Sequence, residues 1–290
     1  IAQKKIGQIT SPFPMGDPRY VPSFDEEVNM VKAVTTERLN KLYEEQLNGM
    51  YGVLSIVGDF DPDLIVLRIE SIVSEWKTDV AYTEIMKPGD LDIKGRIEVV
   101  ETPDKANATY FGATTLPISD SHPDYPALVI GNFILGGGSL SSRLGDRVRQ
   151  KDGLSYGVGS GFNAQATNDR ALFYLYAITN PDNMEKVIAA IAEEVERIRK
   201  DGITKEELAA AQQGYLQEQI VSRSSDKNLT TILAKTEHVD RSMAYYDDLE
   251  EKINAVTAEE VRQALTKYIN FDSIYIVTAG DFKKGKKAAE

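Results

Sequence analysis

The sequence predicts an α+β fold in which helices cover a largely antiparallel sheet. Three observations support this prediction. Strand patterns come before a run of helix patterns in the larger part of the chain, residues typical of helix caps stand where helices are expected to begin, and one helix–strand segment occurs twice. Of the 290 residues, 42% are apolar, which allows a globular protein to bury a sizeable core.

The strand patterns and the first helix patterns are recognised by apolar periodicity bounded by turn residues. In chain order they are strands over 96–101 and 108–115, a helix over about 123–135 that Gly136-Gly137-Gly138 breaks, a short helix over about 141–150, and a hairpin over 154–178 that turns at Thr167-Asn168-Asp169.

A run of helices is predicted after the hairpin. The first has apolar residues at helical spacing over 184–198, and Gly202 ends it. Thr204 and Glu207 form the capping box of a long helix, and two more helices lead to a final strand at Ile274.

The first part of the chain opens with an irregular, proline-rich stretch over 11–22, and three helix starts follow it. These starts are Ser23 with Glu26 as a capping box, Thr36 at the head of a helix to about Asn48, and Asp61 followed by Pro62 at the head of a helix to about Trp76. Residues 82–95, with Pro88-Gly89, are predicted to link this part to the next.

One segment of the chain occurs twice, without a gap, at a constant offset of 222 residues from Ala33 to Ala255. The matches are residues 33–35 and 37 with 255–257 and 259, Asn48 with Asn270, and Gly58-Asp59-Phe60 with Gly280-Asp281-Phe282. In each copy a Thr caps a helix and an apolar run, 53–57 or 274–277, is typical of a buried strand.

The repeat predicts a duplicated domain whose first copy is truncated. Residues 1–88 are then the C-terminal part of the first copy, and residues 89–290 are a complete second copy. The rest of the first copy is expected upstream of Ile1, in a longer protein. The alternative is a pair of unrelated helix–strand units that share common residues.

Composition excludes several classes of function. The formal net charge of −12 repels phosphate backbones, which argues against a nucleic-acid partner. The sequence has no cysteine, and this excludes disulfides, thiolate zinc sites and cysteine nucleophiles. No apolar run approaches the length of a membrane span.

The most specific motif lies between Leu135 and Tyr156. Leu135-Gly-Gly-Gly-Ser-Leu-Ser-Ser-Arg-Leu144 is followed by Arg149-Gln-Lys-Asp-Gly-Leu-Ser-Tyr156. This pattern resembles the Arg/Tyr pair of pitrilysin/insulinase-type (inverzincin) zinc metallopeptidases, in which an Arg ends a short helix and a Tyr seven residues on begins a strand. Residues 13–20 with 58–62, and the T-x-E-E-L helix start at 204–208, also resemble this family. The resemblance implies paired α+β halves that close around a peptide.

The resemblance also implies a role for each residue of the pair. In a zinc peptidase, metal-activated water attacks a carbonyl and negative charge develops on its oxygen. By the resemblance, Tyr156 donates a hydrogen bond to that oxygen, and Arg149 clamps the substrate backbone with its fork of donors. Without the resemblance, Tyr156 would be a strand residue packed on its neighbours, and Arg149 a charge favourably placed at a helix C-terminus.

The residues that would bind zinc are expected elsewhere. The family's catalytic signature is H-x-x-E-H, and a catalytic zinc takes three protein ligands. The chain has two histidines, His122 and His238, and neither belongs to such a motif. The helix near 125–135 corresponds to the family's metal helix but offers Asn132 in place of His or Glu. We therefore predict no metal site in this chain and no peptide hydrolysis by the chain alone.

The resemblance thus predicts the non-catalytic, substrate-binding half of a zinc metalloendopeptidase. Its partners would be a peptide and a catalytic half that carries the zinc, in the same polypeptide or in a separate subunit. The alternative is an inactive structural or binding homologue, such as the family's respiratory-complex core proteins, and the presence of both Arg149 and Tyr156 favours the first. An unrelated α+β binding module is disfavoured by the repeat. Bacterial family members of this form are often periplasmic, which favours that location.

Overall fold

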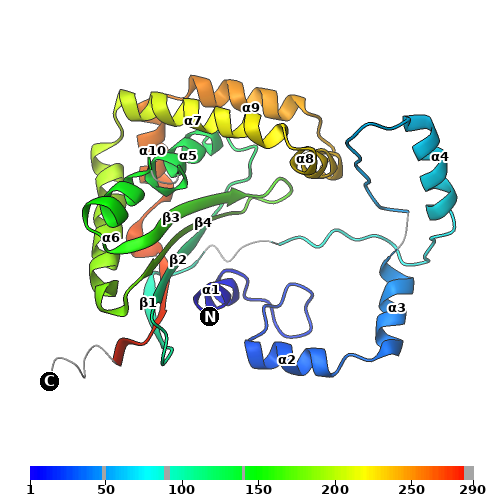
Figure 1. The fold of residues 1–290 in the computed structure, drawn as a ribbon, viewed down its shortest axis with the longest axis horizontal. Helices are drawn as coiled ribbons and strands as arrows, with labels where there is room; N and C mark the ends of the chain where they lie inside the picture. Colours follow the sequence, from blue (N-terminus) through cyan, green and yellow to red (C-terminus); the bar gives the residue numbers. More distant parts are fainter. Residues whose placement is uncertain (48–49, 88–91, 139–140, 284–290) are drawn as a thin grey trace. The chain divides into compact units, whose positions relative to one another are not determined.

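The chain folds into two compact units, seen here in a computed structural model (Figure 1). The structure describes residues 1–47, 50–87, 92–138 and 141–283. The first unit comprises residues 1–21, 87–217 and 248–290, and the second comprises residues 22–86 and 218–247. The first is built around a sheet, and the described part of the second consists of helices and extended segments.

The sheet of the first unit has five strands in the order β1-β5-β2-β4-β3. The pair β1–β5 is parallel, and the other three neighbouring pairs are antiparallel. The strands are β1 (Arg96–Glu101), β2 (Ala108–Leu116), β3 (Ser155–Ala164), β4 (Ala171–Thr179) and β5 (Tyr275–Gly280). Because β5 lies between β1 and β2, the sheet joins the two ends of the second predicted copy.

One face of this sheet is covered by helices (Figure 1). They are α5 (Tyr125–Asn132), which continues into the π-helical turn η1 (Phe133–Gly137), α6 (Met184–Asp201) and α10 (Ala258–Tyr268), joined to the strands by the short turns η4 (Pro181–Asn183) and η5 (Phe271–Ser273). The apolar stripe of α6, including Val187, Ile191 and Val195, is fully buried. The turn η1 approaches β3 closely, because a Cβ at Gly136 would lie 2.4 Å from the Ser160 nitrogen.

The opposite face of the sheet is partly covered by α1 (Ala2–Thr10). Its Ala2 and Ile6 pack with Ala113 of β2 and Val277 of β5 in one apolar cluster. We did not predict this helix from the sequence. A nine-residue segment is too short to be a stable helix by itself, and the sheet that buries its apolar side stabilises it.

The second unit holds α2 (Phe24–Lys32), α3 (Thr36–Gln46), α4 (Pro62–Val73) and α8 (Asp226–His238). The long helix α7 (Lys205–Arg223) and the helix α9 (Ala244–Ala255) each have residues in both units. No residue of α2, α3 or α4 is buried. The described residues between 22 and 86 therefore include helices but no buried core.

The predicted fold class and most predicted elements are confirmed. Strand β1 has the predicted bounds, and the hairpin β3–β4 forms with its turn between Ala164 and Ala171. The capping box of Ser23 with Glu26 is present, and the Asp61 carboxylate accepts from the backbone nitrogens that begin α4. Gly202 ends α6 with a φ of 73°, which favours glycine.

Three predictions about elements were wrong. Residues 53–57 form no strand, and Val53, Leu54 and Ile56 are exposed where we expected a buried run. A strand needs a neighbouring strand, and the described residues offer none beside this segment. Three helices, rather than two, separate α7 from β5, and the helix from Tyr125 continues through η1 to Gly137 instead of stopping at Gly136.

The helix of the repeated segment has corresponding bounds in the two predicted copies. Helix α3 starts after Thr35 and α10 starts after Thr257, and each has 11 residues, so the offset of 222 holds from end to end. Asn48 and the proposed boundary at Pro88-Gly89 lie outside the described residues. The division of the chain into a truncated and a complete copy stays a prediction.

No helix in the part of the chain that the structure describes combines the length and the apolar character that a bilayer crossing requires.

Candidate functional site

Arg149 lies in the last turn of η3 (Gly145–Lys151), a π-helical segment beside β3. Val148 is fully buried and fixes the inner side of this segment. Arg149 is exposed. Isolated π-helical turns are uncommon and occur frequently at functional sites, because they change the direction in which a side chain projects.

A tight connection joins Arg149 to Tyr156. The Asp152 nitrogen donates to the Arg147 carbonyl at 3.0 Å, and the Leu154 nitrogen donates to the Val148 carbonyl at 2.9 Å. Gly153 has a φ of 62°, a conformation that glycine adopts at less cost than a residue with a Cβ. The two predicted site residues are thus brought to adjoining elements by a defined turn.

Tyr156 stands at the start of β3, on a β-bulge. The ladder between β3 and β4 pairs Ser155 with Thr179 and Gly157 with Ile178, which leaves Tyr156 as an extra residue. Its side chain is 58% exposed. Bulges are frequent beside active sites, where they redirect a side chain.

In the described part of the chain, the Arg149 side chain forms neither a hydrogen bond nor an ion pair, whereas its basic neighbours do. Arg143 forms a bidentate pair with Glu207, at 2.7 and 2.8 Å. Arg147 pairs with Asp152 at 3.3 Å and with Glu193 at 3.2 Å.

The Arg143–Glu207 pair anchors the segment that carries Arg149. The Arg143 guanidinium also donates to the Gly202 carbonyl at 2.9 Å, and its hydrogen bonds lower the pKa of Glu207 below the usual range. Glu207 in turn accepts from the Thr204 nitrogen at 2.8 Å, as the predicted capping box requires. The segment before η3 is therefore fixed to the start of α7.

The described residues do not fit a zinc ion. They contain no group of three or more His, Asp or Glu side chains close enough to share a metal. The His122 Nδ1 accepts a hydrogen bond from the Asp124 nitrogen at 3.0 Å, and His238 is the last, exposed residue of α8. The Asn132 side chain, at the end of α5, accepts from the Ser160 hydroxyl at 2.8 Å.

We did not single out Ser155 from the sequence, although the structure places it at the base of the bulge. The only signal was a small polar residue and a glycine on either side of Tyr156. Such a triplet is compatible with a regular strand, so the bulge could not be predicted without the strand register.

The sheet and its helix layer form an α+β domain. Residues 33–215, more than half of the chain, match the family model described as the peptidase M16 inactive domain. The chain belongs to this peptidase family, and the predicted pitrilysin/insulinase-type resemblance is confirmed.

Curated relatives of the chain are named zinc proteases. A zinc protease of Streptomyces coelicolor is 27% identical over 241 residues, which cover 81% of this chain and 51% of that protein. The zinc protease YmxG of Bacillus subtilis is 28% identical over 137 residues, covering 47% of this chain and 32% of that protein. The chain thus spans about half the length of the Streptomyces protein.

Solved structures share the fold. A peptidase M16 inactive domain from Pseudomonas fluorescens aligns with a TM-score of 0.77 and 24% identity, covering 96% of this chain and 64% of that one. The periplasmic protease PqqL from Escherichia coli aligns with a TM-score of 0.58 and 18% identity, covering 77% of this chain and 24% of that one.

Proposed function

We propose that this chain is the substrate-binding, non-catalytic half of a zinc metalloendopeptidase and that Arg149 and Tyr156 contact the peptide. The observation that carries the proposal is that both side chains are exposed and lack partners among the described residues, while Arg143 and Arg147 beside them are paired. A donor that holds no internal partner is available to a ligand.

Tyr156 acts when the peptide is cleaved. The attacking water and the zinc belong to the catalytic half, and the phenol of Tyr156 donates to the carbonyl oxygen as negative charge develops on it. The position of Tyr156 on a bulge, in a strand that belongs to the sheet, supports this role because a rigid element keeps a donor aimed at one point.

Arg149 acts from the moment the peptide binds. Its guanidinium can hold backbone carbonyls or a carboxylate of the substrate in a fork. Since this contact exists before as well as during the reaction, it contributes mainly to binding. The anchoring of the preceding segment by Arg143 supports a fixed position for Arg149.

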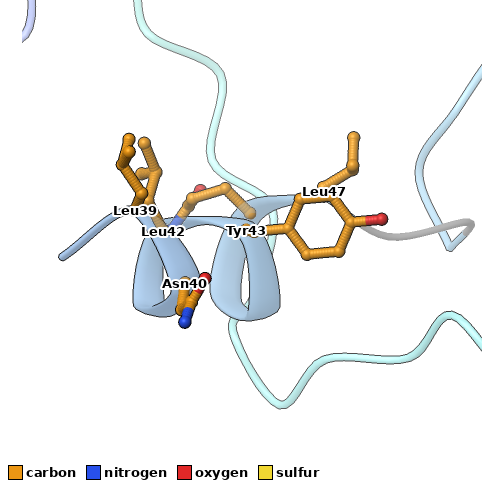
Figure 2. Close-up of a pocket in the computed structure, with 6 residues that line it drawn as sticks. Leu39, Asn40, Leu42, Tyr43 and Leu47 are labelled. Carbon is orange, nitrogen blue, oxygen red and sulfur yellow. The ribbon is translucent and has the colours of Figure 1, made fainter. Parts of the chain in front are cut away.

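The catalytic half is the proposed partner, and α3 offers a surface for it. Leu39, Asn40, Leu42, Tyr43, Gln46 and Leu47 line an open hollow of about 460 Å³ on this helix (Figure 2). Leu39 and Leu42 project from the same side of the helix in this view. Exposed apolar patches of this kind mark sites where another polypeptide packs.

The same surface supports the proposal that residues 1–88 belong to a truncated first copy. A truncated first copy, within residues 1–88, needs the remainder of that copy to cover its apolar residues. In this proposal the assembled enzyme is periplasmic, as the name of the related protease PqqL suggests.

The test compares two variants in the assembled peptidase, in which this chain is joined to the H-x-x-E-H-bearing half, with a quenched fluorescent peptide as substrate. Tyr156→Phe keeps the ring and removes one donor, so kcat should fall about a hundredfold with KM little changed. Arg149→Ala should raise KM about tenfold or more.

Arg147→Ala is the matched control, because it removes a half-buried, paired arginine two residues away. It should leave both constants within about twofold. If Tyr156→Phe keeps full kcat while its thermal melt is intact, the pair has no catalytic role, and the chain is instead an inactive structural or binding homologue.

A further inference from the structure

We propose that Ser155 is a positioning residue that holds the β-bulge at Tyr156 and thereby keeps the phenol exposed at the start of β3. This inference rests on the proposed function of Tyr156. It assigns a role to a buried hydroxyl that does not itself contact substrate.

The register of the hairpin shows what the bulge does. Side chains alternate between the two faces of a strand. One extra residue in the strand therefore changes the face on which the residues before it lie, relative to a regular ladder. In a regular ladder Tyr156 would stand opposite Thr179, which is 1% exposed on the helix-covered face. With the bulge, Ser155 takes that position and is 6% exposed, while Tyr156 has no partner in the ladder and is 58% exposed.

The Ser155 hydroxyl bridges both strands at this point. Its oxygen lies 2.6 Å from the Ile178 carbonyl oxygen and 2.8 Å from the Gly157 carbonyl oxygen, and it accepts from the Gly157 nitrogen at 3.1 Å. The side chain is only 6% exposed, so water cannot readily replace these bonds. Without the hydroxyl, the Gly157 N–H loses this acceptor, and the bulge loses the side-chain contact of Ser155 with the Ile178 carbonyl of β4.

A second hydroxyl fixes the entry to the strand but not the bulge. Thr179 donates from Oγ1 to the Leu154 carbonyl at 2.5 Å, one residue before Ser155. This bond holds the end of the connection from η3 in place. The Ser155 side chain contacts both Gly157, the residue after Tyr156, and Ile178 of β4. We therefore assign the positioning of Tyr156 to Ser155.

The experiment uses the assembled peptidase with a quenched fluorescent peptide and compares Ser155→Ala with Tyr156→Phe and the double variant. Ser155→Ala should lower kcat about tenfold with KM within about twofold, because a misplaced donor affects the transition state most. The double variant should be no slower than Tyr156→Phe alone, because Ser155 acts through the phenol.

Two further variants keep the test specific. Ser155→Thr retains the hydroxyl and should restore kcat to within about threefold of wild type. Ser160→Ala removes another hydroxyl of β3 that is similarly buried, at 7% exposed. This hydroxyl bonds to Asn132 and not to the bulge, so Ser160→Ala should leave kcat unchanged. Hydrogen exchange on the chain alone should show faster exchange of the Gly157 amide in Ser155→Ala and not in Ser160→Ala.

The outcomes separate the two proposals. If Tyr156→Phe has full activity, the proposed function fails. If Tyr156→Phe is slow but Ser155→Ala is as active as wild type, only the positioning role is overturned. It is also overturned if the effects of Ser155→Ala and Tyr156→Phe multiply in the double variant, since Ser155 would then act independently of the phenol.

Discussion

Helices α3 and α10 have the same length and the same capping residue type but opposite surroundings. Each has 11 residues and begins after a Thr whose side chain accepts from the backbone nitrogen three residues on. Their corresponding apolar positions are Leu39 and Val261, Leu42 and Ala264, Tyr43 and Leu265, and Leu47 and Ile269. All four are buried in or just after α10, and all four are exposed at α3.

The difference lies in what packs against each helix. Helix α10 packs on α5 and α6, and the strand that follows it, β5, pairs with β1 and β2. The segment after α3 pairs with no strand in the described residues. An apolar stripe thus shows which side of a helix can be covered, while the surrounding elements decide whether it is covered.

The largest expected effect is a difference between Ile269→Ala and Leu47→Ala. The two residues occupy corresponding positions and have the same volume, but Ile269 is 1% exposed and Leu47 is 50% exposed. Ile269→Ala should lower the free energy of unfolding by about 3 kcal/mol, and Leu47→Ala by less than about 0.5 kcal/mol. Urea unfolding of the chain measures both, and equal losses would show that α3 is buried in solution.

Dye binding should sharpen the comparison at α3. An exposed apolar hollow binds 1-anilinonaphthalene-8-sulfonate, so replacing Leu42 and Leu47 together with Lys should reduce its fluorescence about twofold. Asn40→Lys, which changes a polar residue of the same hollow, is the control for added charge. A decrease of equal size in the control would assign the effect to charge alone.

The helix caps should differ by a smaller amount. Thr257→Ala removes the cap of a helix packed in the core and should destabilise the chain by about 1 kcal/mol. Thr35→Ala removes the corresponding cap of α3. Because α3 can fray locally without disturbing the core, the global free energy of unfolding should fall by only about 0.3 kcal/mol. The two thermal melts would contradict this expectation if they moved by the same amount.

The smallest effect concerns pH. Glu260 completes the capping box of α10, and its hydrogen bonds with Thr257 lower the pKa of the carboxyl below its usual value. A lowered pKa contributes stability above the unfolded-state pKa, and this contribution is lost as the pH falls through the folded-state value. Wild type should therefore melt above Glu260→Ala at pH 7, with a smaller difference near pH 3.

The first predicted copy provides a control for this pH effect, because Arg38 stands where Glu260 stands in the second predicted copy and cannot accept a hydrogen bond. Arg38→Ala should show no such change of its melting difference with pH. A difference for Glu260→Ala that stays constant down to pH 3 would contradict the assigned role of its carboxylate.

Much of the fold could be predicted because local chemistry specifies it. Ser23 with Glu26, Thr204 with Glu207 and Asp61 before a proline each fix a helix start within a few residues. The strand at 53–57 was mispredicted for the opposite reason, since an apolar run becomes a strand only when a neighbour pairs with it. The candidate site residues Arg149 and Tyr156 were predicted from a motif, not from geometry.

The sequence by itself determined the α+β class, the family and the helix caps, and it singled out Arg149 and Tyr156 as candidates, because these depend on residue types at short, fixed spacings. Only the tertiary structure decided that Tyr156 sits on a bulge, that Arg149 has no partner among the described residues, and that α1 covers the sheet. Each of these depends on strand register or on contacts between residues far apart in the chain, which local patterns do not encode.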